Sequence, residues 1–228
     1  MQFGGKSVPK NSPKKIVSAI SKSEQLMVLN TPHRCQIAAL IMMLTGLRVG
    51  ELLALEWSDI DFENRRLYVR QHAVKIAPNK FEVQPGTKNG KNRYVTIPEN
   101  LIEFLEKSKL NAKSYLVFPK TDNTLNTPSS WKSAWNSYIN TLNWKNSGYK
   151  GSKFDPKGYP KSIKINPHQL RHTYATLLYK SGTDLKTASK LLGHSTVQLT
   201  LDIYTHLDEE YKTLDISKFN DFLSKDLM

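Results

Sequence analysis

Apolar residues recur at helical spacing through the first quarter of the chain and predict three helices. The first begins near Ser23, a residue type that favours helix N-termini, and the second covers residues 33–44, which are nearly all apolar. Glycine adopts the left-handed conformation most easily, so we expect Gly46 to end the second helix. The third helix covers about residues 49–56.

The apolar spacing then changes to one typical of strands. Three short segments rich in β-branched and aromatic residues are bounded by Pro, Asn and Gly: residues 67–70, 81–84 and 93–97. Asn89-Gly90 is a strong signal for a tight hairpin turn between the last two segments. The pattern predicts a small three-stranded antiparallel sheet over residues 66–97, followed by a helix from Pro98 to about Leu110.

Helical spacing returns at Ser129-Ser130, where one face of the predicted helix carries an apolar, largely aromatic stripe: Trp131, Trp135, Tyr138 and Leu142. Such a stripe could stack on bases, but packing against a core is the more common role, and we expect it here. Asn166 is suited to cap a further helix whose first residue is Pro167, and Gly182 is expected to end it.

Two more helices are predicted near the C-terminus. A short one over residues 184–192 ends at Gly193, and Ser195 with Gln198 forms a capping box for the next, which carries Leu199 and Ile203. A polar break at 208–210 precedes a final amphipathic stretch over residues 214–223.

These elements predict an α+β fold class: a mainly α-helical core with a small three-stranded antiparallel sheet near the N-terminal third. We expect residues 1–22 to form a basic linker, residues 23–207 to form one domain, and residues 208–228 to form a C-terminal tail. The tail packs either on its own chain or on a neighbouring copy.

Charge indicates the kind of partner. The 228 residues contain 33 Lys+Arg against 20 Asp+Glu, a formal net charge of +13, which favours a polyanion such as DNA. Residues 1–22 hold five lysines and no acid. Residues 143–165 read as a basic insertion loop with six lysines and one acid, Asp155. Each segment is either a contact for a nucleic-acid backbone or a solvated surface.

Several classes of protein do not fit the sequence. The longest apolar run, residues 37–44, is far shorter than the roughly 20 residues of a membrane helix, and the N-terminus lacks the apolar stretch of a signal peptide. One cysteine, Cys35, forms no internal disulfide and is expected to fill the core. We therefore expect a soluble, cytoplasmic protein that makes no membrane contact.

A set of residues could cleave a phosphodiester without a metal ion. That reaction needs fixed cations around the phosphate, a nucleophile, and an acid for the leaving oxygen. Two arginines lie in T-G-L-R-V-G-E-L and P-H-Q-L-R-H-T, where His168 precedes Arg171 by three residues on one helix face. The full candidate set is Arg48, Lys88, His168, Arg171, His194 and Tyr204.

Two alternatives bear on this set. Lys91 or Arg93 could take the place of Lys88, because all three lie in or beside the same predicted turn. His168 and His172 have the spacing of zinc ligands, but Gln169 stands where a metalloprotease carries its glutamate base. We therefore expect neither a metal ion nor a cofactor.

The motifs T-G-L-R-V-G-E-L, H-Q-L-R-H-T, L-L-G-H and I-Y-T-H together resemble the tyrosine recombinase family of the phage-integrase type, over about residues 23–207. The resemblance implies a catalytic domain that cleaves and rejoins DNA through a 3′-phosphotyrosine, for the integration or excision of a phage or mobile element. It also implies a bacterial, DNA-associated protein that forms a tetramer on double-stranded attachment-site DNA and a monomer when free. Accessory partners such as an excisionase or a DNA-bending protein are implied as well. A non-catalytic DNA-binding relative and a type IB topoisomerase are the alternatives.

The resemblance also implies a role for each residue. Tyr204 matches the nucleophile, Arg48 and Arg171 match the arginines on the non-bridging oxygens, and Lys88 matches the general acid. His168 matches the histidine that accepts the tyrosine proton. His194 matches the histidine that supports the phosphate, and Glu51 matches an acidic residue that orients the site. Family members usually carry an N-terminal core-binding domain, for which this sequence has no room.

Overall fold

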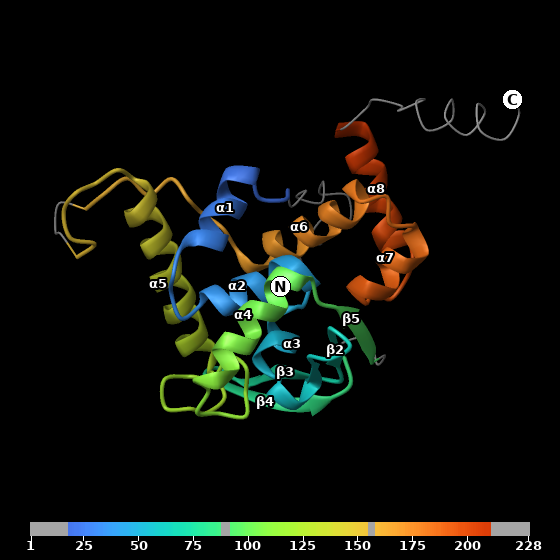
Figure 1. The fold of residues 1–228 in the computed structure, drawn as a ribbon, viewed down its shortest axis with the longest axis horizontal. Coiled ribbons are helices and arrows are strands. Elements are labelled where there is room, and N and C mark those ends of the chain that lie inside the picture. The colour runs from blue at the N-terminus through green and yellow to red at the C-terminus, as the bar shows by residue number, and fades with distance from the viewer. Residues whose placement is uncertain (1–17, 88–91, 155–157, 211–228) are drawn as a thin grey trace, which may run out of the picture.

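The structure is a computed structural model that describes residues 18–87, 92–154 and 158–210. A buried helix, α2 (Gln36–Thr45), lies in the middle of the fold. It packs against α1 (Lys22–Asn30), α4 (Glu99–Leu110) and α6 (Pro167–Lys180) (Figure 1). Most of its residues are buried because helices cover it from several sides, which explains why its sequence is apolar all round. The α+β prediction is confirmed.

The first helices differ from the prediction at their ends. Ser21 caps α1 instead of Ser23, because the Ser21 side chain accepts a hydrogen bond from the Glu24 backbone N–H while the Glu24 carboxylate accepts one from the Ser21 N–H. Ser23 has no Glu or Gln three residues later, so it offers no such exchange. As predicted, Gly46 ends α2 in the left-handed region, and α3 (Val49–Leu53) is shorter than expected.

The prediction of one three-stranded sheet over residues 66–97 is wrong in its pairing. Strands β1 (Ile60–Asp61), β2 (Arg66–Val69) and β5 (Arg93–Thr96) form one antiparallel sheet. Strands β3 (Gln71–Ala77) and β4 (Lys80–Pro85) form a separate hairpin. A short 3-10 helix, η1 (Trp57–Asp59), leads into β1.

Strand β4 therefore pairs with β3, which the sequence reading missed, and not with β5 across Asn89-Gly90. The turn that joins β3 to β4 contains Pro78-Asn79, which are common turn residues. Leu67 lies opposite Val95, so β2 and β5 share a buried apolar face. Residues 88–91 lie outside the described residues.

The aromatic stripe packs in the core, as expected. It lies on α5 (Pro128–Asn146), where Trp135, Tyr138 and Leu142 are buried and Trp131 packs edge-on against Phe118. Helix α5 includes the first four residues of the predicted insertion 143–165. Cys35 is buried, and burial raises the pKa of its thiol to about 12, which agrees with a role in the core.

The C-terminal helices agree with the prediction except at α8. Asn166 caps α6, and Asp184 caps α7 (Leu185–Leu192). Helix α8 (Gln198–Glu210) begins at Gln198, so the predicted capping box at Ser195 is wrong, and the helix continues through the predicted break at 208–210. No helix within the described ranges has the length and apolar character to cross a membrane.

Candidate active site

Glu51 is the centre of a cluster of charged side chains. It is the third residue of α3, and its side chain is 1% exposed. One carboxylate oxygen accepts from the Arg48 guanidinium at 3.0 Å, and the other accepts from the Arg48 backbone N–H at 2.9 Å. The carboxylate therefore caps α3 and holds the Arg48 side chain at the start of that helix.

Arg93 reaches the same carboxylate from β5. Its two terminal nitrogens donate to the two oxygens of Glu51 at 3.0 and 2.9 Å, a bidentate pair, and its Nε donates to the Leu191 carbonyl at 3.0 Å. The Arg93 side chain is 9% exposed. The sequence reading named Arg93 only as a rival of Lys88, so this role was missed.

Arg171 enters the cluster from α6 and is held by main-chain oxygens. It donates to the Gly46 carbonyl at 2.6 Å and to the Leu192 carbonyl at 2.5 Å. A glycine at position 46 lets the end of α2 approach α6 closely, because a Cβ there would lie 2.4 Å from the Tyr174 ring. The end of α2 therefore lies directly against α6.

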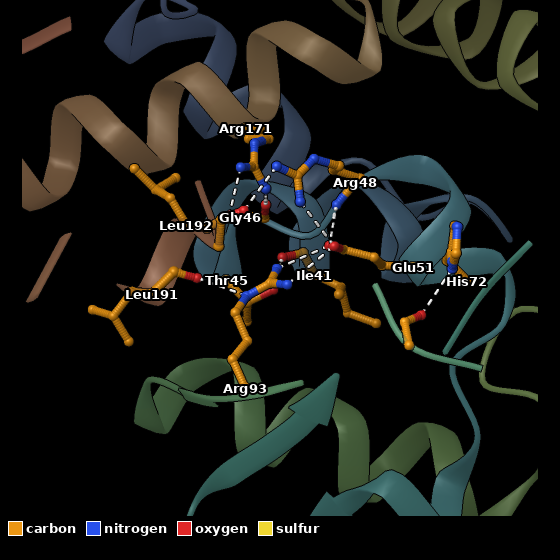
Figure 2. Close-up of polar contacts among 12 residues, drawn as sticks. Ile41, Thr45, Gly46, Arg48, Glu51, His72, Arg93, Arg171, Leu191 and Leu192 are labelled. Atoms are coloured by element: carbon orange, nitrogen blue, oxygen red, sulfur yellow. Dashed lines mark hydrogen bonds and ion pairs between the residues drawn. The ribbon is translucent and has the colours of Figure 1, made fainter. Parts of the chain in front are cut away.

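The three arginines share the C-terminal end of α7. The carbonyls of Leu191, Leu192 and Gly193 accept hydrogen bonds from Arg93, Arg171 and Arg48 in that order (Figure 2). The last carbonyls of a helix lack partners within the helix and carry its negative dipole end, so guanidinium groups suit them. We call Arg48, Glu51, Arg93, Arg171 and these carbonyls the arginine cluster.

The pKa values reflect this arrangement. Burial alone would raise the pKa of Glu51, but hydrogen bonds from Arg93 and Arg48 and their charges hold it at about 2. Burial and the nearby Arg48 charge lower the pKa of Arg171 to about 9. Glu51 is thus firmly anionic, whereas the hydrogen bonds described for the Arg171 guanidinium all go to carbonyl oxygens. An added oxyanion would relieve the cost of burying that charge.

Two histidines lie beside the arginine cluster. Burial and the Arg171 and Arg48 charges lower the pKa of His194 to about 3 and also lower the pKa of His168. A hydrogen bond of 2.8 Å joins His194 Nδ1 to the buried Thr200 hydroxyl on α8. Both imidazoles are therefore neutral at pH 7, and a neutral imidazole is able to accept a proton.

His168 also contacts a third histidine. Its ring meets His172 edge-on at 4.8 Å, and burial with His168 and Arg171 lowers the pKa of His172 to about 4. Across the described ranges, no three or more His, Cys, Asp or Glu side chains form a group suited to a metal ion.

Tyr204 lies on α8 and makes different contacts. Its hydroxyl donates to the Thr183 carbonyl at 3.2 Å, and its ring packs edge-on against Tyr179. Burial and the Asp184 charge raise the pKa of Tyr204 to about 12. The structure therefore brings Arg48, Glu51, His168, Arg171 and His194 into one neighbourhood and engages the Tyr204 hydroxyl at the junction of α6 and α7. Lys88 lies outside the described residues.

Arg93 and Thr200 escaped the sequence reading for different reasons. Arg93 stands 42 positions from Glu51, and a single sequence gives no signal for that pairing. Its place on the buried side of β5, opposite Val69, was the available clue, because a buried arginine requires a partner. Thr200 carries an ordinary hydroxyl on a helix, and no local pattern marks it.

Chemically, the arginine cluster has the groups to receive an oxyanion. The guanidinium groups of Arg48 and Arg93 pair with the Glu51 carboxylate, that of Arg171 is held nearby by backbone carbonyls, and the Arg48 side chain is 26% exposed. Guanidinium forks match the oxygens of a phosphate group. The neutral His168 and His194 lie at the rim of this positive site.

Comparison with known proteins gives consistent results. The profile described as the Phage integrase family matches residues 8–211. A "Tyrosine recombinase XerC-like" protein of Caldanaerobacter subterraneus subsp. tengcongensis is 36% identical over 214 residues, covering 83% of this chain and 50% of that protein. The "ICEBs1 integrase" of Bacillus subtilis is 31% identical, covering 80% of this chain and 48% of its own. The chain thus spans about half the length of these relatives.

Solved structures share the fold. The Tn1549 transposon integrase in complex with a circular intermediate DNA has a TM-score of 0.68 at 20% identity, covering 92% of this chain and 67% of its own. The crystal structure of XerA recombinase has a TM-score of 0.57 at 22% identity, covering 96% of this chain and 66% of its own.

Proposed function

Because the chain belongs to the phage integrase family of tyrosine recombinases, we propose that it cleaves and rejoins DNA at specific sites through a covalent intermediate on Tyr204. The observation that carries the proposal is the arginine cluster, where Arg48 pairs with the buried Glu51 carboxylate and backbone carbonyls hold Arg171, beside two neutral histidines. Such a site matches the charge that develops on a phosphate in the transition state.

The proposed step is one transesterification. The Tyr204 oxygen attacks phosphorus, the bond from phosphorus to the 5′-oxygen breaks, and a 3′-phosphotyrosine and a 5′-hydroxyl result. His168 accepts the tyrosine proton, and Lys88 donates a proton to the leaving 5′-oxygen. Arg48 and Arg171 hold the non-bridging oxygens, and His194 supports them. The phosphotyrosine conserves the energy of the phosphodiester, so the reverse attack by a 5′-hydroxyl needs no cofactor.

The proposed partner is double-stranded DNA that carries the attachment sites of a phage or mobile element. The relatives include the ICEBs1 integrase of Bacillus subtilis, and the fold is similar to that of the Tn1549 transposon integrase in complex with a circular intermediate DNA. We propose that residues 23–207 are the catalytic domain, that four copies assemble on two DNA sites, and that an excisionase or DNA-bending protein assists.

The basic insertion is proposed to contact the DNA backbone. A groove lies between α5 and the side chains of Lys153, Phe154 and Tyr159, and its lining also includes Lys132 and Asn136. The Tyr159 hydroxyl donates to the Asn140 carbonyl at 3.0 Å, which ties the insertion to α5. Lysine and amide side chains are common partners of phosphate oxygens, and they position DNA without reading its sequence.

The test is a nicked suicide substrate that carries the attachment core of the element encoding the chain. We expect a covalent protein–DNA adduct that forms in EDTA and is lost in Tyr204→Phe. The matched control is Tyr179→Phe, whose ring contacts that of Tyr204, and it should retain the adduct. An adduct that survives Tyr204→Phe would overturn the nucleophile, and loss of the adduct in EDTA would favour a metal-dependent reaction.

Two further measurements separate the alternatives. Lys88→Ala should block cleavage of ordinary DNA and spare a substrate whose 5′-oxygen is replaced by sulfur, a better leaving group. Joining of two DNA partners distinguishes a recombinase from a type IB topoisomerase, which relaxes one supercoiled circle. A non-catalytic relative would bind the DNA and form no adduct with either substrate.

A further inference from the structure

The position of Arg93 is unusual for a charged residue. Strand β5 alternates between its two faces, and Arg93 shares with Val95 the face that turns to the buried side, opposite Leu67 and Val69 of β2. A guanidinium in such a place is costly unless its hydrogen bonds are satisfied. Three donor atoms of Arg93 are paired, two with Glu51 and one with the Leu191 carbonyl.

These contacts join three elements that carry the proposed site. Through Glu51, Arg93 reaches α3 and the carboxylate that holds both the backbone and the side chain of Arg48. Through Leu191, it reaches the end of α7, two residues before the turn that carries His194. Arg93 is thus the link between the group that holds Arg48 and the backbone that places His194.

The end of α7 is shaped to receive this side chain. Gly193 has a φ of +62°, and a Cβ there would lie 2.7 Å from an Arg93 terminal nitrogen and 2.8 Å from its Cζ. Glycine is therefore required both for the left-handed cap and for the close approach of the guanidinium plane. The fit is one of shape as well as charge, which lysine could not reproduce.

We propose that Arg93 is a positioning residue of the phosphate site: it acts through Glu51 on Arg48 and through the Leu191 carbonyl on the turn that carries His194. This inference rests on the proposed function, and it assigns Arg93 no contact with the DNA. The bidentate pair with Glu51 and the bond to Leu191 engage all three nitrogens of its guanidinium, whereas the Arg48 side chain retains exposed surface.

The first test compares single-turnover rates on the suicide substrate at saturating DNA. We expect Arg93→Gln to slow adduct formation about 10- to 100-fold, as loss of an orienting partner does at other sites, and to change the Kd for DNA less than about threefold. Arg93→Lys should recover only part of the rate. The control Arg66→Gln removes another carboxylate-paired arginine, on β2, whose side chain is 47% exposed, and should stay within about twofold.

The rate constant of adduct formation and the fraction of protein that reacts distinguish a positioning role of Arg93 from a role in folding. A merely structural Arg93 would lower the fraction of protein that reacts and leave the rate constant of the reacting fraction unchanged, and that result would overturn the proposal. Arg93→Gln leaves the buried Glu51 carboxylate short of partners and could unfold the chain. The double variant Glu51→Gln with Arg93→Gln removes both charges and keeps the test available.

The double variant also tests whether Arg93 acts on Arg48 through Glu51. If Arg93 acts on Arg48 through Glu51, the double variant should be no more than about threefold slower than the slower single variant. Effects that multiply would show that Arg93 acts independently of Glu51 and would overturn that part of the proposal.

A probe without DNA keeps the inference separate from the proposed function. Inorganic phosphate, titrated into the full chain and followed by the NMR signals of the His194 ring, should bind about tenfold more weakly to Arg93→Gln than to wild type. An unchanged phosphate Kd would overturn the positioning role. If wild type binds phosphate and forms no Tyr204-dependent adduct, the proposed function fails and the phosphate titration still decides the role of Arg93.

Discussion

The arginine cluster and helix α8 lie side by side and are built in opposite ways. In the arginine cluster, each guanidinium is fixed by main-chain carbonyls or by a carboxylate that is itself fixed. Helix α8 has a largely apolar inner side, with Leu207 buried and Ile203 against the core, and leaves Leu199 and Leu201 exposed. Among the described contacts, its Tyr204 hydroxyl donates one hydrogen bond, to the Thr183 carbonyl at 3.2 Å.

The difference separates the two parts of the proposed chemistry. The proposed phosphate site is held in place by the fold's own contacts, so little reorganisation would be needed to stabilise an oxyanion. The nucleophile lies on an element held by a different set of contacts. Among the described contacts, a hydrogen bond between the Thr200 hydroxyl on α8 and the His194 ring links the two regions. Substitutions can therefore be aimed at the arginine cluster, at helix α8, or at the hydrogen bond between His194 and Thr200.

Arg171→Lys should have the largest effect, because an ammonium group cannot reach both the Gly46 and Leu192 carbonyls while it also faces a phosphate. We expect adduct formation to slow about 10²- to 10³-fold, by analogy with loss of one oxyanion donor. Single-turnover cleavage of the suicide substrate measures this rate. Arg34→Lys is the control, since Arg34 also donates to a backbone carbonyl, that of Pro119, away from the site. Equal losses in both variants would contradict the prediction.

Gly46→Ala tests the packing behind the cluster. The left-handed φ of +68° and the contact with Tyr174 should together lower the free energy of unfolding by about 2–4 kcal/mol. Gly182→Ala is matched in backbone, with φ of +74° and open space around its Cβ, so it should lose only about 1–2 kcal/mol. Urea unfolding of both variants gives the difference, and equal values would show that the Tyr174 contact is not restrictive.

Acid should weaken the fold through the histidines beside the cluster. The pKa of His172 is about 4 and that of His194 about 3 in the fold, against 6.5 for an ordinary histidine. The unfolded chain therefore binds more protons below pH 6.5. Their contribution to stability is complete above pH 6.5 and is lost as the pH falls toward 4 and 3.

The measurement is the free energy of unfolding between pH 7 and pH 4. Each histidine contributes a slope of up to one proton, or about 1.4 kcal/mol per pH unit. His172→Phe should reduce the slope of the unfolding free energy against pH by the equivalent of less than one proton. A slope that stays the same in this variant would show that His172 titrates alike in both states.

Thr200→Val should have the smallest effect, because it removes one hydroxyl and keeps the side-chain shape. Loss of the hydrogen bond to His194 is expected to cost about 1 kcal/mol, or roughly fivefold in the rate of adduct formation. Thr141→Val is the control, since the buried Thr141 bonds only to the Ser137 carbonyl of its own helix among the contacts described. A rate unchanged in Thr200→Val would mean that α8 does not orient His194.

Local signals predicted the elements that position the site. Gly46, Gly193 and the Asn166 cap mark helix ends through their own backbone preferences, and the structure confirms each of them. The predicted start of α8 was wrong because the turn over residues 194–197 depends on the hydrogen bond between His194 and Thr200. A local capping pattern carries no information on that contact. The family motifs supplied the candidate residues.

Long-range pairing was beyond the sequence. Four-residue strands such as β2 and β5 have no local preference strong enough to choose a partner, so the sheet was assigned the wrong strands. Arg93 was overlooked for the same reason: its partners, Glu51 and Leu191, come from elements 42 positions before it and 98 after it. Only the tertiary structure brings them together.

The carbonyl contacts of the arginine cluster have a consequence for protein engineering. A carbonyl oxygen belongs to every amino acid, so the acceptors of Arg93 and Arg171 at positions 191 and 192 do not depend on the side chains there. The exposed α7 positions Lys186 and Lys190 could therefore be exchanged with the electrostatics of the cluster retained. Gly193 resists exchange because the Arg93 guanidinium lies against it, and Gly46, at the end of α2, resists exchange because the Tyr174 ring needs the space.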